Sequence, residues 1–235
     1  MAESKIEWTG STWNPITGCD KHSSGCQNCY AEKMANRLKN MRLEKYKNAF
    51  RLTLHEDEIE KPLTMKKPQT IFVCSMSDIF HKDVPDSFIL RLFEVMNKAH
   101  WHTFQVLTKR AERISDLKDK INWTSNIWLG VTVESDEYTH RIDHLRESGA
   151  HIKFLSIEPM LSAIPNMNLT NVDWVIVGGE SGTNPRPIEK EWVTDIKNQC
   201  LKTFTPFFFK QWGGKNKKKN GRELDGKIYD ELPIQ

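Results

Sequence analysis

The chain contains 235 residues, a length that fits one large domain or two small ones. Its 34 lysine and arginine residues nearly balance 31 aspartate and glutamate residues, and the net charge of +3 excludes a wholly basic nucleic-acid coat protein and an acidic disordered tail protein. Apolar residues make up 38%, enough for a core, and no run approaches the roughly 18 uninterrupted apolar residues of a membrane span. Because the first ten residues lack the apolar stretch of a signal peptide, we expect a cytoplasmic, single-domain protein.

Strands and helices are predicted to alternate along the chain. The segment 8–18 can supply a first strand, and residues 30–47 predict a charged helix with Met34 and Leu38 on its inward side. Runs rich in β-branched and aromatic residues predict further strands at 70–78, 103–110, 127–134, 151–158, 174–180 and 206–212. Helical periodicity predicts helices over 88–99, 136–148 and 189–201, whereas residues 159–173 show no helical pattern.

This alternation is typical of an α/β fold with a parallel sheet. The predicted strands are continuous apolar runs, as expected for strands that are buried on both faces. At this length the candidates are a partial (β/α) TIM-like barrel and an open doubly wound sheet. We favour a single-domain partial barrel of about six or seven parallel strands, because polar residues gather where a barrel would bring them together.

Polar and charged side chains follow each predicted strand, and parallel strands end at one common face. The candidates at these ends are Ser75, Ser77, Asp78, Lys109, Arg110, Thr132, Glu134, Ser156, Glu158, Glu180, Ser181, Lys210 and Gln211. His81, just beyond the end of the 70–78 run, is predicted to lie at the mouth as a proton donor or substrate contact. The alternative for each residue is an ion pair or a polar boundary in the barrel rim.

Three cysteines, Cys19, Cys26 and Cys29, lie within eleven positions in the spacing C-x6-C-x2-C. Clustered thiols in a reducing compartment are expected to be metal ligands rather than disulfides. Three thiolates that hold a four-iron cluster leave one iron free for an outside ligand. The main alternative is a Cys3His zinc site completed by His22, and the remaining one is three unrelated thiols. Cys74 and Cys200 are expected to be small buried hydrophobes.

Several segments resemble the radical S-adenosylmethionine (SAM) superfamily, and more closely a bacterial and phage family of three-cysteine-motif, radical-SAM-like proteins. They are WNPITGCDKHSSGCQNCYAEKMANR, FVCSMSDIFHKDVP, FQVLTKR, WLGVTVES, FLSIEPM, WVIVGGESG, PRPIEKEWV and FFFKQWGG, which together cover most of residues 6–214 in order. Two features depart from the superfamily: the first gap has six residues instead of three, and Asn28 replaces the usual aromatic residue before the third cysteine.

The resemblance implies a [4Fe–4S] cluster on Cys19, Cys26 and Cys29, SAM bound at the open iron, and a reducing electron donor. Reductive cleavage of SAM would release a 5′-deoxyadenosyl radical. By strand order, the resemblance assigns cofactor binding to Ser75, Ser77, Asp78, Lys109, Arg110 and Glu134. Asp78 would accept the SAM ammonium, Lys109 or Arg110 would pair with its carboxylate, and Glu134 would bind its ribose. His81, Glu158, Glu180, Arg186 and Lys210 would then face the substrate.

The segment 215–222, KNKKKNGR, is the one basic run. It is either a solvated end or a contact for phosphates, so nucleic acid is a lesser candidate partner. We therefore expect a barrel over residues 1–214, with its cluster loop at 19–29, and a basic extension at 215–235. The leading hypothesis is a radical SAM enzyme acting on a nucleotide, a nucleic-acid base or another substrate. The alternatives are a non-enzymatic zinc- or iron–sulfur-binding adaptor for nucleic acid or protein, and a barrel that has lost catalysis.

Overall fold

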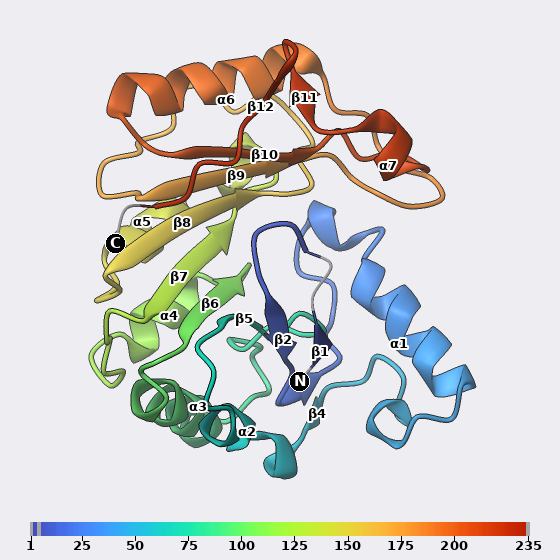
Figure 1. The fold of residues 1–235 in the computed structure, drawn as a ribbon, viewed down its shortest axis with the longest axis vertical. Coiled ribbons are helices and arrows are strands. Elements are labelled where there is room, and N and C mark those ends of the chain that lie inside the picture. Colours follow the sequence, from blue (N-terminus) through green and yellow to red (C-terminus); the bar gives the residue numbers. More distant parts are fainter. Residues whose placement is uncertain (1, 4–5, 234–235) are drawn as a thin grey trace.

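Seven parallel strands follow one another around a curled sheet in the order of the chain (Figure 1). The computed structural model describes residues 2–3 and 6–233. The parallel strands are β2 (Ser11–Trp13), β5 (Thr70–Val73), β6 (Thr103–Thr108), β7 (Ile127–Thr132), β8 (Ile152–Ile157), β9 (Trp174–Gly178) and β10 (Phe207–Gln211). A short antiparallel strand, β1 (Ala2–Glu3), adds to the β2 edge. The fold is a partial (β/α) barrel, and this confirms the predicted fold class.

Helices cover the outer face of the sheet between successive strands (Figure 1). They are α3 (Asp86–Lys98), α4 (Glu112–Leu117), α5 (Arg141–Arg146) and α6 (Lys190–Thr203). Three others lie outside this layer: α1 (Tyr30–Asn40), α2 (Lys61–Thr64) and α7 (Lys217–Asn220). Four 3-10 turns, η1 (Ser24–Cys26), η2 (Glu44–Tyr46), η3 (Glu56–Glu58) and η4 (Asp136–Tyr138), complete the helical segments.

Two predicted helices are shorter than their periodicity suggests. The helix expected over 30–47 ends at Asn40, and Arg42 then takes a left-handed φ of 59°, which a continuing helix does not allow. The segment 136–148 divides into η4 and α5. Met34 is 39% exposed, so its predicted inward position is wrong; Ala31 and Ala35 form the buried side of α1.

The parallel strands bury both of their faces, as the continuous apolar runs predict. Alternate residues pack outward beneath the helices, and the others point into the curl, where they form an aromatic cluster around the fully buried Trp174. The ring centroids of Phe154 and Trp174 lie 5.7 Å apart. Gly130 leaves room for the Phe154 ring, because a Cβ at residue 130 would lie 2.5 Å from it. The aromatic cluster includes the first inward residues of several strands, and the polar inward residues follow toward the carboxyl ends.

Two small antiparallel ribbons flank the barrel. One joins β3 (Ile16–Thr17) to β4 (Thr53–Leu54), and the other joins β11 (Glu223–Leu224) to β12 (Lys227–Ile228). The chain after β12 lies along β10, where the backbone of Phe209 donates to the carbonyl of Tyr229 at 2.9 Å. Among the described helices, none combines the length and the apolar character that a membrane crossing requires.

Candidate functional site: a three-cysteine cavity

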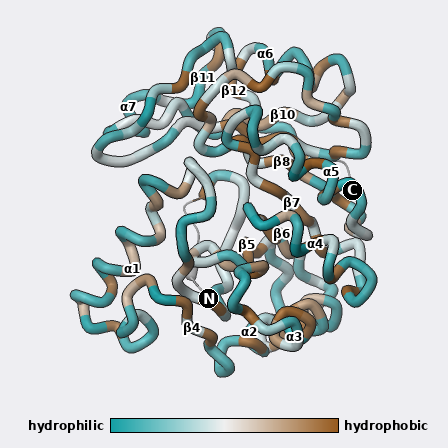
Figure 2. Tube along the Cα trace, turned by 180° about the vertical axis from the view of Figure 1, so that it is seen from behind, coloured by the Kyte–Doolittle hydropathy of each residue, from teal (hydrophilic) through white to brown (hydrophobic). Residues whose placement is uncertain are grey.

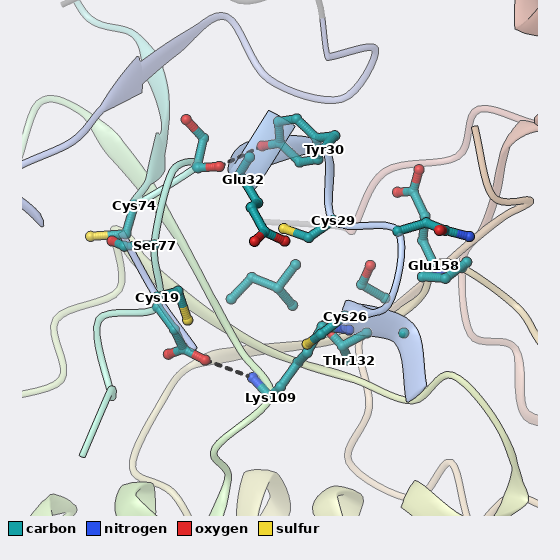
Figure 3. Close-up of a pocket in the computed structure, with 18 of the residues that line it drawn as sticks. Cys19, Cys26, Cys29, Tyr30, Glu32, Cys74, Ser77, Lys109, Thr132 and Glu158 are labelled. Carbon is teal, nitrogen blue, oxygen red and sulfur yellow. Dashed lines mark hydrogen bonds between the residues drawn. The ribbon is translucent and has the colours of Figure 1, made fainter. Parts of the chain in front are cut away.

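A cavity of about 680 Å³ opens at the carboxyl ends of the parallel strands, and the thiols of Cys19, Cys26 and Cys29 line it (Figure 3). The strand ends supply the polar remainder of the wall. Of the predicted site residues, the cavity lining includes Ser75, Ser77, Asp78, Lys109, Arg110, Glu158, Glu180 and Lys210. Thr132, at the end of β7, also lines it, so the fold brings together the three cysteines and the ends of six strands, β5, β6, β7, β8, β9 and β10, which are far apart in the sequence.

Each cysteine has a distinct local position. Cys19 follows Gly18, whose φ of 82° and close approach to the Arg51 carbonyl require a glycine. Cys26 ends the 3-10 turn η1, and Cys29 immediately precedes α1. All three thiols are free and partly exposed, whereas Cys74 and Cys200 are free and buried as expected. Burial raises the pKa of the Cys19 thiol to about 12 and also raises the pKa of Cys29.

The donor set suits an iron–sulfur cluster better than a single zinc ion. Zinc–thiolate bonds of about 2.3 Å in a tetrahedron hold their sulfurs roughly 3.8 Å apart. Within the described residues, the three cysteine sulfurs do not all lie within 4.8 Å of one another, and no compact ligand group includes His22. A cluster whose thiolates bind different iron atoms tolerates a wider spread of sulfurs. The three thiols are therefore not gathered around a single zinc-sized point, and their number and type are those of a cluster ligand set.

One tighter group does occur, and it shares a cysteine with the first. Ligand atoms of Cys19, Asp20 and His81 lie within 4.8 Å of one another. Its sulfur, carboxylate and imidazole donors are types that bind a single transition-metal ion. Since Cys19 belongs to both sets, the two arrangements exclude each other.

Glu134 does not line the cavity; it lies beneath the cluster loop, defined as residues 19–29. Its carboxylate is fully buried and accepts hydrogen bonds from Ser23 and Lys109 and, at 2.8 Å, from Arg141. A Cβ at Gly25 would come within 2.5 Å of the Glu134 side chain, so the loop passes directly over the carboxylate. Burial opposes ionisation, but the Lys109 charge and these hydrogen bonds lower the pKa of Glu134. In this position Glu134 anchors the loop, and the loop separates it from the cavity.

Asp78 and Arg110 also form hydrogen bonds and ion pairs with other protein groups. One Asp78 oxygen accepts from the Thr108 hydroxyl at 2.7 Å, and the other accepts from the Lys109 amide and the Arg110 guanidinium, each at 3.1 Å. Arg110 reaches onward to the Asp20 carboxylate in the cluster loop. Asp78 and Arg110 thus link the ends of β5 and β6 to the residue after Cys19.

A third anchor comes from the end of β9. Glu180 accepts from Asn28 at 2.9 Å and is paired with Arg186, which also donates to the Ser24 carbonyl at 2.9 Å. Burial would raise the pKa of Glu180, but the hydrogen bonds from Arg186 and Asn28 overcome this and lower it to about 2. Glu180 and Arg186 therefore hold the loop on both sides of Cys26.

The predicted residues that remain least engaged with the loop are Glu158 and Lys210. The Lys210 ammonium lies 2.7 and 2.9 Å from the two carboxylate oxygens of Glu158, and both side chains keep some exposure to the cavity. On another part of the lining, the Ser77 hydroxyl donates to the Ile16 carbonyl at 3.0 Å, which leaves its oxygen able to accept. Ser75 exchanges hydrogen bonds with Asn14.

His81 lies behind the cavity wall and is 2% exposed, so the structure does not place it at the predicted position in the mouth. Its Nδ1 accepts from the Asp83 amide at 3.2 Å, and its Nε2 lies 3.0 Å from the Asp20 carboxylate. The turn that follows Asp78 directs the imidazole toward the base of the loop.

Sequence reasoning missed the partners that hold the loop, namely Asp20, Ser23, Asn28 and Arg141. Of these residues, only Arg141 could have been recognised from the sequence pattern. It shares a helical face with Tyr138, Ile142 and Leu145, and an arginine on a buried face needs a buried anion. The others are ordinary polar loop residues, whose roles depend on contacts distant in the sequence.

Comparison with known proteins gives a fold and a family. A structure of spore photoproduct lyase complexed with dinucleoside spore photoproduct matches at a TM-score of 0.51 and 13% identity, over 86% of this chain and 63% of the lyase chain. A mutant of spore photoproduct lyase with bound AdoMet and the same dinucleoside matches at 0.47 and 12% identity, over 81% of this chain and 61% of the mutant lyase chain. At these identities the likeness concerns the fold alone, and the chain spans less than two thirds of either lyase chain.

Curated protein sequences provide no match to this chain. A family profile, in contrast, matches residues 3–233. The chain therefore belongs to the family DUF5131, which is described as a protein of unknown function.

Proposed function

We propose that this chain is a radical SAM enzyme in which Cys19, Cys26 and Cys29 hold a [4Fe–4S] cluster and the adjoining cavity takes SAM and a substrate. The observation that carries the proposal is that three free thiols line one cavity, at the carboxyl ends of a partial barrel. Such a cluster, once reduced by an electron donor, supplies the electron that cleaves SAM to methionine and a 5′-deoxyadenosyl radical.

The chain's own residues then divide between two tasks. Glu134, Asp78, Arg110 and Glu180 hold the cluster loop through the contacts described above, so that the thiols are positioned before anything binds. Ser77, Glu158 and Lys210 present polar groups to the ligands in the cavity. The Glu158–Lys210 pair offers a carboxylate and an ammonium side by side, which suits a ligand that carries both charges, as SAM does.

Anaerobic reconstitution tests the proposal. The protein should become brown, bind about four irons per chain, and convert SAM to 5′-deoxyadenosine under a strong reductant. Cys26→Ala should lower the iron content and abolish 5′-deoxyadenosine. Cys200→Ala, which removes a buried thiol on α6 outside the cavity lining, is the matched control and should retain both. A colourless protein with one zinc per chain would refute the proposal.

The second candidate is a non-enzymatic adaptor that holds one metal ion on Cys19, Asp20 and His81, and the proximity of their ligand atoms favours it. His81→Gln separates the two functions. The adaptor would lose its metal in this variant, whereas the iron content of the proposed enzyme should change little, because His81 does not line the cavity.

A further inference from the structure

We infer that the cavity mouth binds single-stranded nucleic acid, with a base on the ring of Tyr30 and phosphates on basic side chains of α1 and of the segment around α7. The inference deepens the proposed function by naming its substrate class. It concerns binding, so it can be tested without SAM chemistry, and either proposal can fail without the other.

Tyr30 is an exposed aromatic ring in a fixed position. It lies at the cavity beside Cys29, and 56% of its surface is exposed (Figure 3). Its hydroxyl points inward and donates to the Ser75 carbonyl at 2.5 Å. The ring therefore offers a face to the solvent without rotating freely, which lowers the entropy cost of stacking a planar base on it.

A stripe of exposed side chains continues from Tyr30 along α1. Lys33, Met34, Arg37 and Met41 follow at the spacing of one helical face, opposite the buried Ala31 and Ala35. Lys33 and Arg37 form no salt bridge with the described residues. The Lys33 ammonium lies 3.7 Å from the point where a side chain at Gly182 would begin, so it reaches across to the loop after β9. Aromatic, aliphatic and cationic groups thus alternate on one surface beside the cavity.

Lysines from two further segments complete the mouth. Lys21 of the cluster loop and Lys217 of α7 both line the cavity. Lys215 and Lys219 are exposed on either side of Lys217, and α1 and α7 lie on the same side of the molecule in both views (Figures 1 and 2). The only salt bridge among these lysines joins Lys217 to Glu7 at 3.4 Å, within the part of the chain that the structure describes.

The charge at this mouth is concentrated compared with the chain as a whole, whose net charge is only +3. The basic groups are Lys21, Lys33, Arg37, Lys215, Lys217 and Lys219. Glu32 also lines the cavity, and Glu7 is the partner of Lys217. The other acidic residues of the lining are each paired with an arginine or lysine that is not among these basic groups; they are Asp20, Asp78, Glu158 and Glu180. A local excess of cations next to an exposed aromatic ring is complementary to a strand that alternates phosphates and bases. A base stacked inside a duplex is inaccessible to such a ring, so we assign a single strand.

Fluorescence anisotropy with labelled single-stranded DNA and RNA of about 12 nucleotides tests the inference on the full chain. The double variant Lys33→Glu/Arg37→Glu should weaken binding at least about tenfold and lower the salt slope by about 1.4, as expected for two lost phosphate contacts. The matched control is Lys66→Glu/Lys67→Glu, which makes the same change in net charge on exposed residues before the amino end of β5, at the opposite end of the strands. Screening over a Debye length of about 8 Å should keep its effect below about twofold.

The base contact has its own test. Tyr30→Ala should weaken binding of the normal oligonucleotide about tenfold, as the loss of one base stack predicts, and should leave binding of an abasic oligonucleotide nearly unchanged. Circular dichroism of each variant verifies that the fold is kept. Equal losses in the two double variants, or no measurable binding by the wild type at about 50 mM salt, would overturn the inference. Comparison of DNA with RNA identifies which strand is preferred.

Discussion

At the scale of single residues, the main result concerns the charged residues that end the strands. Glu134, Asp78 and Glu180 are expected from the resemblance to contact ligands, yet their oxygens accept hydrogen bonds from the cluster loop or its neighbours. Their contacts are those of ion pairs in the barrel rim, the alternative considered from the sequence, and a direct role of these residues toward a ligand stays a prediction. A carboxylate held by several protein donors positions the groups that donate to it.

Glu134→Gln tests this at its most buried position. The change leaves Arg141 and Lys109 without their anion, and removing one partner of a buried ion pair costs about 3–5 kcal/mol. We expect the free energy of unfolding, measured in urea with the metal-free protein, to fall by about 3 kcal/mol, because Lys109 retains some exposure. Glu137→Gln, at a nearby exposed position, should change it by less than about 0.5 kcal/mol. Equal small effects would show that Glu134 anchors nothing.

Glu180 should make the free energy of unfolding depend on pH, and the lowered pKa of this residue fixes the direction. Its pKa in the folded protein is about 2, below the ordinary 4.5, so its ionised form stabilises the fold above pH 4.5 and this contribution disappears as the pH falls toward 2. Glu180→Gln should therefore destabilise the protein at pH 7, and the difference from the wild type should shrink between pH 4.5 and pH 3. Urea titrations across this range measure it, with the exposed Glu191→Gln on α6 as control. A difference that grows as the pH falls contradicts the assignment.

At the scale of elements, the strands could be predicted and the ends of several helices could not. Each predicted strand run contains an observed strand, because a strand buried on both faces leaves an uninterrupted apolar record in the sequence. The end of α1 at Asn40 depends on a left-handed residue, Arg42, that periodicity does not encode. The cluster loop shows the same limit: the spacing of its cysteines is visible in the sequence, but the residues that hold it come from four strand ends, those of β5, β6, β7 and β9.

The close packing inside the curl leads to a prediction about the stability of the fold. Gly130 on β7 faces the Phe154 ring on β8, and an added Cβ would lie 2.5 Å from that ring. Gly130→Ala should therefore destabilise the fold by about 1–3 kcal/mol, the usual cost of overpacking a core. Gly10→Ala, where the nearest atom would lie 3.4 Å away, should have little effect. Thermal unfolding of both variants provides the comparison, and similar melting temperatures would exclude a tight β7–β8 contact.

At the scale of the whole molecule, the packed interior of the barrel and the candidate site occupy different parts of the curled sheet. The aromatic cluster fills the curl, the strand ends hold a three-cysteine loop over the remaining space, and α1 and the segment around α7 border its mouth. The fold class was predictable because it rests on periodicity. The contacts that individual polar residues make could not be predicted, because they depend on which strand ends lie next to the cluster loop in the folded chain.

The central claim is that three thiols hold a cluster with one iron open to SAM. Electron paramagnetic resonance of the reconstituted, reduced protein, recorded with and without SAM, tests it most directly. We expect a reduced [4Fe–4S] signal that changes when SAM is added, because SAM would become a ligand of the open iron. The absence of any cluster signal, or a signal that SAM leaves unaltered, would contradict the account.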